Sequence, residues 1–207
     1  MTKYIVIAGE TGSGKTTIIN SIIEKMKDTI IEKETIYTTR KPREGEFSSD
    51  NYKFIDIKTA CDIINHHFVV SNNTYHMLTK DGKEEVRYIT IDKGNLIPVI
   101  NQENKFYIVG GSLELMLDYI KYYGVKSIIP IFLDAPFEVR FDRVINRKDD
   151  SSEFLPEICR RLASDVEDRI KFEKKNHTLM EQIHIVDNSA NDDSALNTII
   201  EIINRCK

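Results

Sequence analysis

The sequence predicts an α/β fold in which a parallel sheet is covered by helices on both faces. Three observations predict it: short apolar runs alternate with helical patterns along the 207 residues, the first run ends at a glycine-rich turn, and a helical pattern starts directly after that turn. Apolar residues make up 41% of the chain and charged residues 30%, as in ordinary globular proteins. We therefore expect a single domain that buries its own core.

The first elements follow from local patterns. The β-branched run KYIVIAG at 3–9 is typical of a buried parallel strand. Ile18, Ile22 and Met26 recur every four residues, which predicts a helix over 15–27. Two more strands and a short helix are predicted next, at 34–40, 52–56 and 57–67.

The stretch from 68 to 91 alternates poorly. It contains three short β-like pieces around a polar hinge, TKDGKEE at 79–85. We interpret it as a small antiparallel insert.

Strand and helix patterns alternate again from residue 92 onward. The predicted helices are 92–102 (broken by Pro98), 113–124 (closed by Gly124), 137–147, 151–175 and 192–205. The predicted strands are 105–111, a run within 127–136 that ends at Asp134, and 182–188.

Charge and cysteine usage exclude several classes of function. The net charge of −4 argues against a general affinity for nucleic acid or for an anionic membrane, so any anion site must be local. Cys61, Cys159 and Cys206 lack zinc-site spacing and are expected to be reduced thiols in a cytoplasmic protein. The N-terminal apolar run is too short for a signal peptide or a membrane span. We expect a monomer or a homodimer.

The strongest motif is GETGSGKTT at 9–17, which fits G-x-x-x-x-G-K-[ST] between a predicted strand and a predicted helix. Its glycines let successive backbone N–H groups point at phosphate oxygens, and the helix start adds a positive dipole end. Lys15 is expected to reach the β- and γ-phosphates of ATP, and Thr16 to ligate Mg²⁺. The expected ATP-binding residues are Gly9, Glu10, Thr11, Gly12, Ser13, Gly14, Lys15, Thr16 and Thr17.

A second cationic segment, TTRKPREGE at 38–46, carries Arg40 and Arg43 around a Pro-Gly turn. Their planar guanidinium groups suit a monophosphate, which they can bind through paired hydrogen bonds. The alternative is a solvated charged turn. The preceding phosphate-binding motif favours a second phosphate site, and the segment is expected to follow the second strand of the parallel sheet.

The order of the GETGSGKTT motif, TTRKPREGE and DNYKFI resembles the guanylate kinase family over most of the chain. The resemblance implies a P-loop kinase in which Arg40, Arg43 and Tyr52 bind the phosphate of an acceptor nucleoside monophosphate. It also implies a second phosphate-binding tyrosine at Tyr88 and a small hydroxyl residue near the base at Thr90.

The resemblance also implies a lid. Arg143 and Arg147 precede the acidic segment KDDSSEF, and Arg160 and Arg161 follow it on a helix. Arginines that close over a transferring phosphoryl group stabilise its spread negative charge. The resemblance thus implies Lys15, Arg143, Arg147 and Arg161 as catalytic residues, whereas a surface salt bridge is as good an interpretation of Arg160.

The family pattern fails at the base end of the acceptor site. Val70 and Gly111 stand where the family has base-binding carboxylates, Val109 replaces a further Asp, and Ile36 replaces a Ser. Unpaired buried base donors cost about 1–3 kcal/mol each, so guanine is expected either to bind poorly or to be recognised by other groups.

The sequence leaves open which residues, if any, replace the carboxylates that the family has at positions 70, 109 and 111. Asp81, Glu84 and Glu85 are either substitutes or exposed hinge charges. Asp134 is either a replacement for the lost outer-shell Mg²⁺ partner or a helix N-cap residue.

The expected division is a core of 1–36, 92–137 and 176–207, a monophosphate-binding lobe of 37–91 and a lid region of 138–175. The expected function is transfer of the γ-phosphoryl group of ATP to a nucleoside monophosphate, with GMP or dGMP implied by the resemblance. The alternatives are a kinase for another phosphorylated acceptor, such as a ribose bisphosphate, and a binding module that has lost catalysis.

Overall fold

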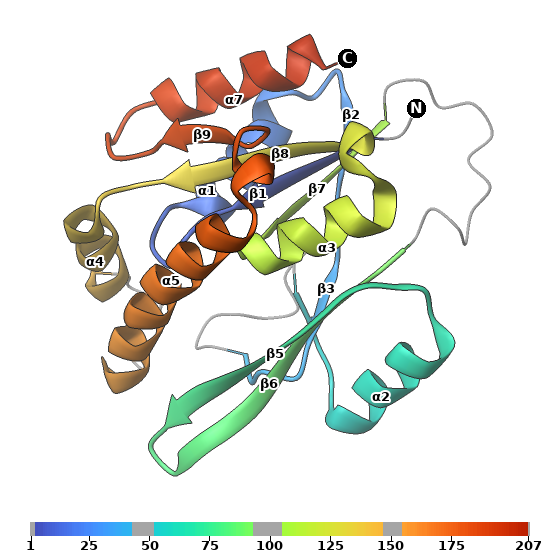
Figure 1. The fold of residues 1–207 in the computed structure, drawn as a ribbon, viewed down its shortest axis with the longest axis vertical. Coiled ribbons are helices and arrows are strands. Elements are labelled where there is room, and N and C mark those ends of the chain that lie inside the picture. Colours follow the sequence, from blue (N-terminus) through green and yellow to red (C-terminus); the bar gives the residue numbers. More distant parts are fainter. Residues whose placement is uncertain (1–2, 43–51, 93–104, 147–154, 207) are drawn as a thin grey trace.

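The computed structural model describes residues 3–42, 52–92, 105–146 and 155–206 (Figure 1). Its larger sheet has five parallel strands in the order β2-β7-β1-β8-β9. These strands are β1 (Lys3–Ala8), β2 (Ile30–Lys33), β7 (Lys105–Gly111), β8 (Ile128–Asp134) and β9 (His184–Asp187). The predicted α/β class with a parallel sheet is confirmed.

Helices cover both faces of this sheet, as the strand–helix alternation requires. On one face α1 (Lys15–Lys25) and α7 (Ser194–Arg205) pack in one apolar cluster with alternate residues of β1. On the other face α3 (Leu113–Tyr123) and part of α5 (Leu155–Lys175) pack on the intervening residues. Thus Ile5 and Ile7 point to the first cluster and Tyr4 and Val6 to the second, which is the period-2 pattern of a buried strand.

A smaller sheet has four strands in the order β4-β3-β6-β5. They are β3 (Ile36–Thr38), β4 (Tyr52–Phe54), β5 (Val69–Thr79) and β6 (Gly82–Ile91), with α2 (Ile57–His66) packed beside them. In Figure 1 the β5–β6 hairpin runs beneath α3, away from the parallel sheet.

Two sequence predictions about this region are wrong. The predicted strand at 34–40 is not the second strand of the parallel sheet, because the strand that forms there, β3, pairs with β4 and β6 of the smaller sheet. The edge position next to β7 in the parallel sheet is taken by β2, which the sequence patterns did not predict. The segment from 68 to 91 forms two long strands rather than three short pieces, and only the turn between Thr79 and Gly82 interrupts them. Cross-strand pairing therefore overrides the irregular local pattern.

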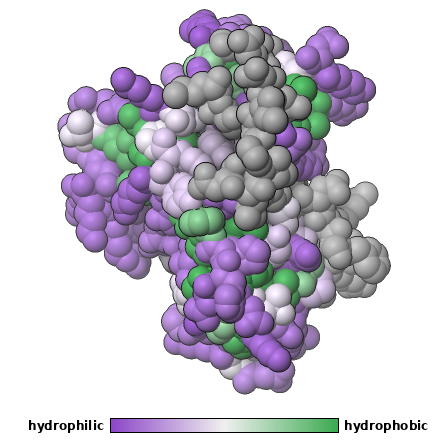
Figure 2. Space-filling model, turned by 90° about the vertical axis from the view of Figure 1, so that its right-hand side faces the viewer, coloured by the Kyte–Doolittle hydropathy of each residue, from purple (hydrophilic) through white to green (hydrophobic). Residues whose placement is uncertain are grey.

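The remaining elements are η1 (Val125–Ser127), α4 (Phe137–Ile145) and α6 (His177–Met180). The predicted helix at 92–102 falls, apart from Asp92, outside the described residues, as do Arg43, Arg147 and the start of the predicted helix at 151–175. Among the described residues, no helix has the length and apolar character needed to cross a membrane. Figure 2 shows a mostly hydrophilic surface on one side of the molecule, with hydrophobic residues in separate groups.

Candidate active site

The turn between β1 and α1 has the curled backbone that the glycine-rich motif predicts. Gly12 and Gly14 have φ of 82° and 95°, a region that other residues rarely adopt. A Cβ atom at Gly12 would lie 2.5 Å from the carbonyl oxygen of Arg140, and one at Gly14 would lie 2.5 Å from Nδ2 of Asn188. Asn188 also donates a hydrogen bond of 2.8 Å to the Ser13 carbonyl, so the end of β9 fixes the shape of the loop.

Lys15 begins α1 and folds back over the loop. Its Nζ donates to the carbonyl oxygens of Gly9 at 2.6 Å and Glu10 at 2.9 Å. Thr16 and Thr17 lie exposed in the first helical turn. An ammonium group and an exposed hydroxyl beside a helix N-terminus are suited to a nucleotide phosphate and to a hard cation that keeps waters and phosphate oxygens as ligands.

Beneath the loop lies a buried ion pair that the sequence analysis missed. Arg140 of α4 pairs with Glu10 at 3.0 Å, and their side chains are only 3% and 8% exposed. Arg140 also donates to the carbonyl oxygens of Ala135 at 3.1 Å and Thr11 at 3.3 Å. Burial raises the pKa of Glu10 above its ordinary value, while the charges of Arg140 and Arg169 oppose that rise.

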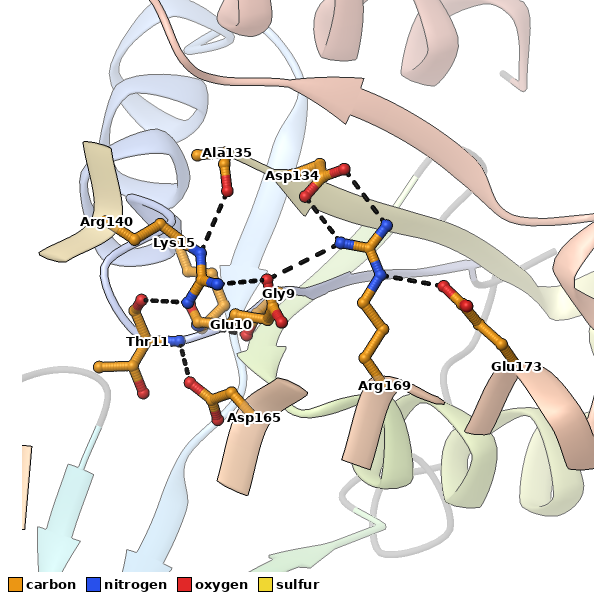
Figure 3. Close-up of polar contacts among 10 residues, drawn as sticks. All are labelled: Gly9, Glu10, Thr11, Lys15, Asp134, Ala135, Arg140, Asp165, Arg169 and Glu173. Atoms are coloured by element: carbon orange, nitrogen blue, oxygen red, sulfur yellow. Dashed lines mark hydrogen bonds and ion pairs between the residues drawn. The ribbon is translucent and has the colours of Figure 1, made fainter. Parts of the chain in front are cut away.

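Arg169 of α5 extends this network across the end of β8 (Figure 3). It donates to both carboxylate oxygens of Asp134, at 2.9 and 3.3 Å, and to Glu173 at 2.9 Å. Its Nη1 lies 3.8 Å from Glu10. Asp134 is therefore ion-paired, and Pro136 rather than Asp134 holds the N-cap position of α4, so the N-cap interpretation is wrong.

Helix α5 makes a second contact with the loop. The backbone N–H of Thr11 donates to Oδ2 of Asp165 at 2.6 Å, as Figure 3 shows. Backbone N–H groups of such a loop are the groups that bind phosphate oxygens. A carboxylate of this chain thus occupies one anion-binding position of the loop.

The predicted acceptor residues that the structure describes share one face of the smaller sheet. Arg40 is buried, with its guanidinium 5.5 Å from the ring centre of Tyr52 and 5.2 Å from that of Phe54. The Tyr52 and Tyr88 rings meet edge-on at 6.3 Å. The Arg40 Nη1 also donates to the carbonyl oxygen of Lys41 at 2.9 Å. Stacking on aromatic rings and this hydrogen bond together hold the guanidinium in one orientation.

Thr90 lies deeper than expected for a group that contacts a base. It is 1% exposed and lies beside the hydroxyl of Tyr119 on α3. Tyr75 of β5, which the sequence analysis did not single out, packs edge-on against Tyr88 at 5.7 Å. Its hydroxyl lies 3.2 Å from the Ser112 hydroxyl at the start of α3.

The positions that depart from the family pattern have apolar surroundings in the structure. Val70, Val109 and Ile36 belong to the core cluster between the hairpin and the parallel sheet. A Cβ atom at Gly111 would lie 2.9 Å from Cδ1 of Leu115, so this position has little room for a side chain unless Leu115 moves.

The acidic residues considered as replacements lie toward the hairpin tip. Asp81 is exposed in the turn, and Glu85 is exposed and pairs with Arg87 at 3.2 Å. Glu84 pairs with Lys41 at 3.4 Å. These contacts match the alternative interpretation, in which all three are surface charges.

A polar cluster that the sequence analysis missed lies at the base of the hairpin. Ser71 donates to Oδ2 of Asp118 on α3 at 2.8 Å. Asn73 donates to the Ser71 hydroxyl at 2.8 Å and to the same Asp118 oxygen at 3.3 Å. The run SNNT at 71–74 is polar throughout, so no alternation in the sequence marked these two residues.

The arginines predicted to belong to a lid have different surroundings. Arg143 of α4 lies 3.5 Å from the carbonyl oxygen of Ala190 and from Oδ1 of Asn191. Arg160 makes two hydrogen bonds of 2.7 Å with Glu157, which matches the salt-bridge interpretation. Glu157 is buried and also accepts the backbone N–H of Leu78 at 2.6 Å, so the hairpin tip contacts α5. Arg161 lies on the same helix.

Among the described residues, metal-binding side chains do not form a site of their own. Within the described ranges, no group of three or more His, Cys, Asp or Glu residues is arranged to hold a metal ion. Mg²⁺ commonly keeps several waters and substrate phosphate oxygens as ligands, so a single hydroxyl such as that of Thr16 is compatible with a site of this kind.

Comparisons with known proteins fit this arrangement. The chain is 30% identical to the guanylate kinase of Mycoplasmopsis pulmonis over 84% of this chain and 86% of the relative. It is 28% identical to that of Anaplasma phagocytophilum over 73% of this chain and 67% of the relative. The crystal structure of guanylate kinase from Anaplasma phagocytophilum superimposes with a TM-score of 0.65 at 15% identity, covering 99% of this chain and 86% of that one. Residues 4–109 match the family model of the 50S ribosome-binding GTPase, a segment that contains the P-loop.

Proposed function

This chain belongs to the guanylate kinase family, and from that premise we propose that it transfers the γ-phosphoryl group of ATP to a nucleoside monophosphate, GMP or dGMP. An oxygen of the acceptor phosphate attacks the γ-phosphorus, the bond to the β–γ bridging oxygen breaks, and ADP leaves. The acceptor becomes a diphosphate. The acceptor oxygen is already anionic, so no general base is needed, and catalysis consists of positioning and charge stabilisation.

The P-loop is the observation that carries this proposal. The curled backbone, the helix start at Lys15 and the exposed Thr16 together support a triphosphate site at this loop. In the proposed complex Lys15 leaves the Gly9 and Glu10 carbonyls for the β- and γ-phosphates. Mg²⁺ held at Thr16 supplies further neutralisation of the phosphate charge.

The acceptor phosphate is assigned to Arg40, Arg43, Tyr52 and Tyr88. The stacking of the Arg40 guanidinium on Tyr52 supports this assignment, because it presents a fixed planar donor group. Arg143, Arg147 and Arg161 are assigned to the transferring group, in a lid region of 138–175. The proposed location is cytoplasmic.

A panel of acceptors tests the proposal. Each common ribo- and deoxyribonucleoside monophosphate is incubated with ATP and Mg²⁺, and the diphosphate product is separated by ion-exchange chromatography. We expect a diphosphate with a guanine acceptor, and its formation should fall by at least about 100-fold in Lys15→Ala, since removal of one preorganised charge-stabilising group typically costs that much. No product from any monophosphate would overturn the assigned reaction.

A kinase for another phosphorylated acceptor is the second candidate. The apolar surroundings of Val70 and Gly111 favour it, because they remove carboxylates from two positions that the family uses for the base. A ribose bisphosphate added to the same panel separates the two candidates by which compound gains a phosphate. Calorimetry with ATP tests the non-catalytic alternative, which predicts no ATP binding.

A further inference from the structure

The base of the β5–β6 hairpin carries a polar row on the same face as the acceptor tyrosines. Ser71 lies opposite Thr90 and Asn73 lies opposite Tyr88 in the antiparallel register. Directly opposed residues of two paired strands point to the same side of the sheet. The side chains of Ser71 and Asn73 therefore face α3, next to Tyr88, rather than the solvent side of the lobe.

This row ends on one carboxylate. Oδ2 of Asp118 accepts from both Ser71 and Asn73, so two neutral donors fix the orientation of the carboxylate. In the part of the chain that the structure describes, the second oxygen, Oδ1, accepts no hydrogen bond from protein. An ionised carboxylate can accept about four hydrogen bonds, so Asp118 retains capacity for further N–H donors.

Asp118 contacts a residue next to the predicted base end of the acceptor site. Val70, one residue before Ser71, and Gly111, just before α3, are the two positions where the family has base-binding carboxylates. Both lie in or against the apolar cluster that includes Leu115 and Tyr119 of α3. Ser71, which is 3% exposed, lies between this apolar cluster and the carboxylate of Asp118.

We propose that Asp118, held by Ser71 and Asn73, is the group that reads the acceptor base, in place of the carboxylates missing at positions 70 and 111. This inference rests on the proposed function. A carboxylate discriminates best for a base edge with adjacent N–H donors, and guanine presents N1–H and the 2-amino group side by side. The acceptor is therefore a guanine nucleotide, read from α3 rather than from the hairpin and the end of β7.

The competing explanation is purely structural: Asp118 would tie the hairpin to α3 and never contact a ligand. Analogues of the acceptor separate the two explanations. IMP has the phosphate, the sugar and N1–H of GMP but lacks the 2-amino group. A structural role would change the affinity for GMP and IMP by the same factor, whereas a base-reading role changes their ratio.

The experiment measures binding of GMP and IMP by calorimetry, with wild type, Asp118→Asn and Ser71→Ala. We expect wild type to bind GMP about 10- to 100-fold more tightly than IMP, the range for a hydrogen bond to a charged acceptor. Asp118→Asn should bring the ratio close to one, because the amide presents an N–H to a donor edge. Ser71→Ala should lower the ratio less, because the carboxylate remains but is held by one donor.

Asp62→Asn is the matched control, since it makes the same substitution at an exposed position of α2. Circular dichroism confirms that each variant is folded, and retention of the wild-type GMP-to-IMP ratio by folded Asp118→Asn would overturn the inference. Equal binding of the two nucleotides by wild type, or binding of neither, would overturn it as well. Calorimetry needs no turnover, so a protein that binds GMP selectively but forms no diphosphate would refute the proposed reaction and leave the base-reading role standing.

Discussion

Asp165 of α5 accepts the backbone N–H of Thr11 at 2.6 Å, so a helix of the proposed lid region places a negative charge on the P-loop. An incoming nucleotide brings phosphate oxygens to the same loop. The carboxylate and the nucleotide therefore compete for the positive potential of the backbone.

The first prediction concerns this competition. Asp165→Asn should tighten ATP binding by about fivefold, because it removes about 1 kcal/mol of repulsion between unit charges at close range in water. Calorimetry with ATP and Mg²⁺ measures the change. Glu167→Gln is the control, since it removes a charge from an exposed position of the same helix that pairs only with Lys171 among the described residues. Unchanged or weaker ATP binding in Asp165→Asn would show that the contact does not oppose the nucleotide.

The second prediction concerns the buried ion pair beneath the loop. Arg140→Ala should lower the free energy of unfolding by about 3–5 kcal/mol, because it leaves the Glu10 carboxylate buried without its main partner. Urea denaturation measures the loss. Arg205→Ala, which breaks an exposed pair with Glu201, should cost about 1 kcal/mol or less. Similar losses in the two variants would contradict the importance assigned to the buried pair.

The third prediction follows from the raised pKa of Glu10. Burial shifts this pKa above the ordinary 4.5, so between the two values the folded protein binds more protons than the unfolded chain. The stability of wild type relative to Glu10→Gln should therefore fall as the pH rises from about 4.5 through the folded-state pKa, and then level off. Urea denaturation of both proteins over a pH series measures the difference. A relative stability that rises with pH over this window would give the opposite sign and refute the assignment.

The fourth prediction concerns the acceptor phosphate. Arg40→Lys keeps the charge but loses the planar donor group that stacks on Tyr52 and Phe54. We expect the KM for the acceptor to rise about tenfold, the effect of losing roughly one charge-assisted hydrogen bond, with little change in the KM for ATP. Steady-state kinetics with each substrate varied in turn measures both constants. An equal rise in both would indicate a general disturbance rather than a phosphate contact.

Local patterns predicted much of the fold. The P-loop, the helix after it and the buried strands β1, β7 and β8 follow from short-range signals that the structure retains. Strand β2 was missed because IIEK lies half exposed at the sheet edge, where neither alternation nor a long apolar run marks it. The hairpin was divided into three because polar residues such as Ser71 and Asn73 interrupt its pattern, although they face α3.

The polar networks of the candidate site were beyond local patterns. Glu10 meets Arg140 and Arg169, which lie far along the chain on two other helices. Asp118 likewise meets Ser71 only because the hairpin lies under α3. Charged residues on a predicted helix are usually solvated, so nothing in the sequence distinguished these from their exposed neighbours. The sequence shows that carboxylates are missing at Val70 and Gly111, but it does not show that Ser71, Asn73 and Asp118 meet beside these positions.

The bond between the Leu78 amide and Glu157 joins the hairpin tip to the helix that follows the lid segment. In the proposed reaction, one of these parts holds the acceptor nucleotide and the other closes over the donor. If the hairpin tip or α5 moves outward, either this hydrogen bond breaks or the other part moves with it. A hydrogen bond to a charged group contributes about 1.5–3 kcal/mol, so movements of the hairpin and of α5 are coupled by about that much.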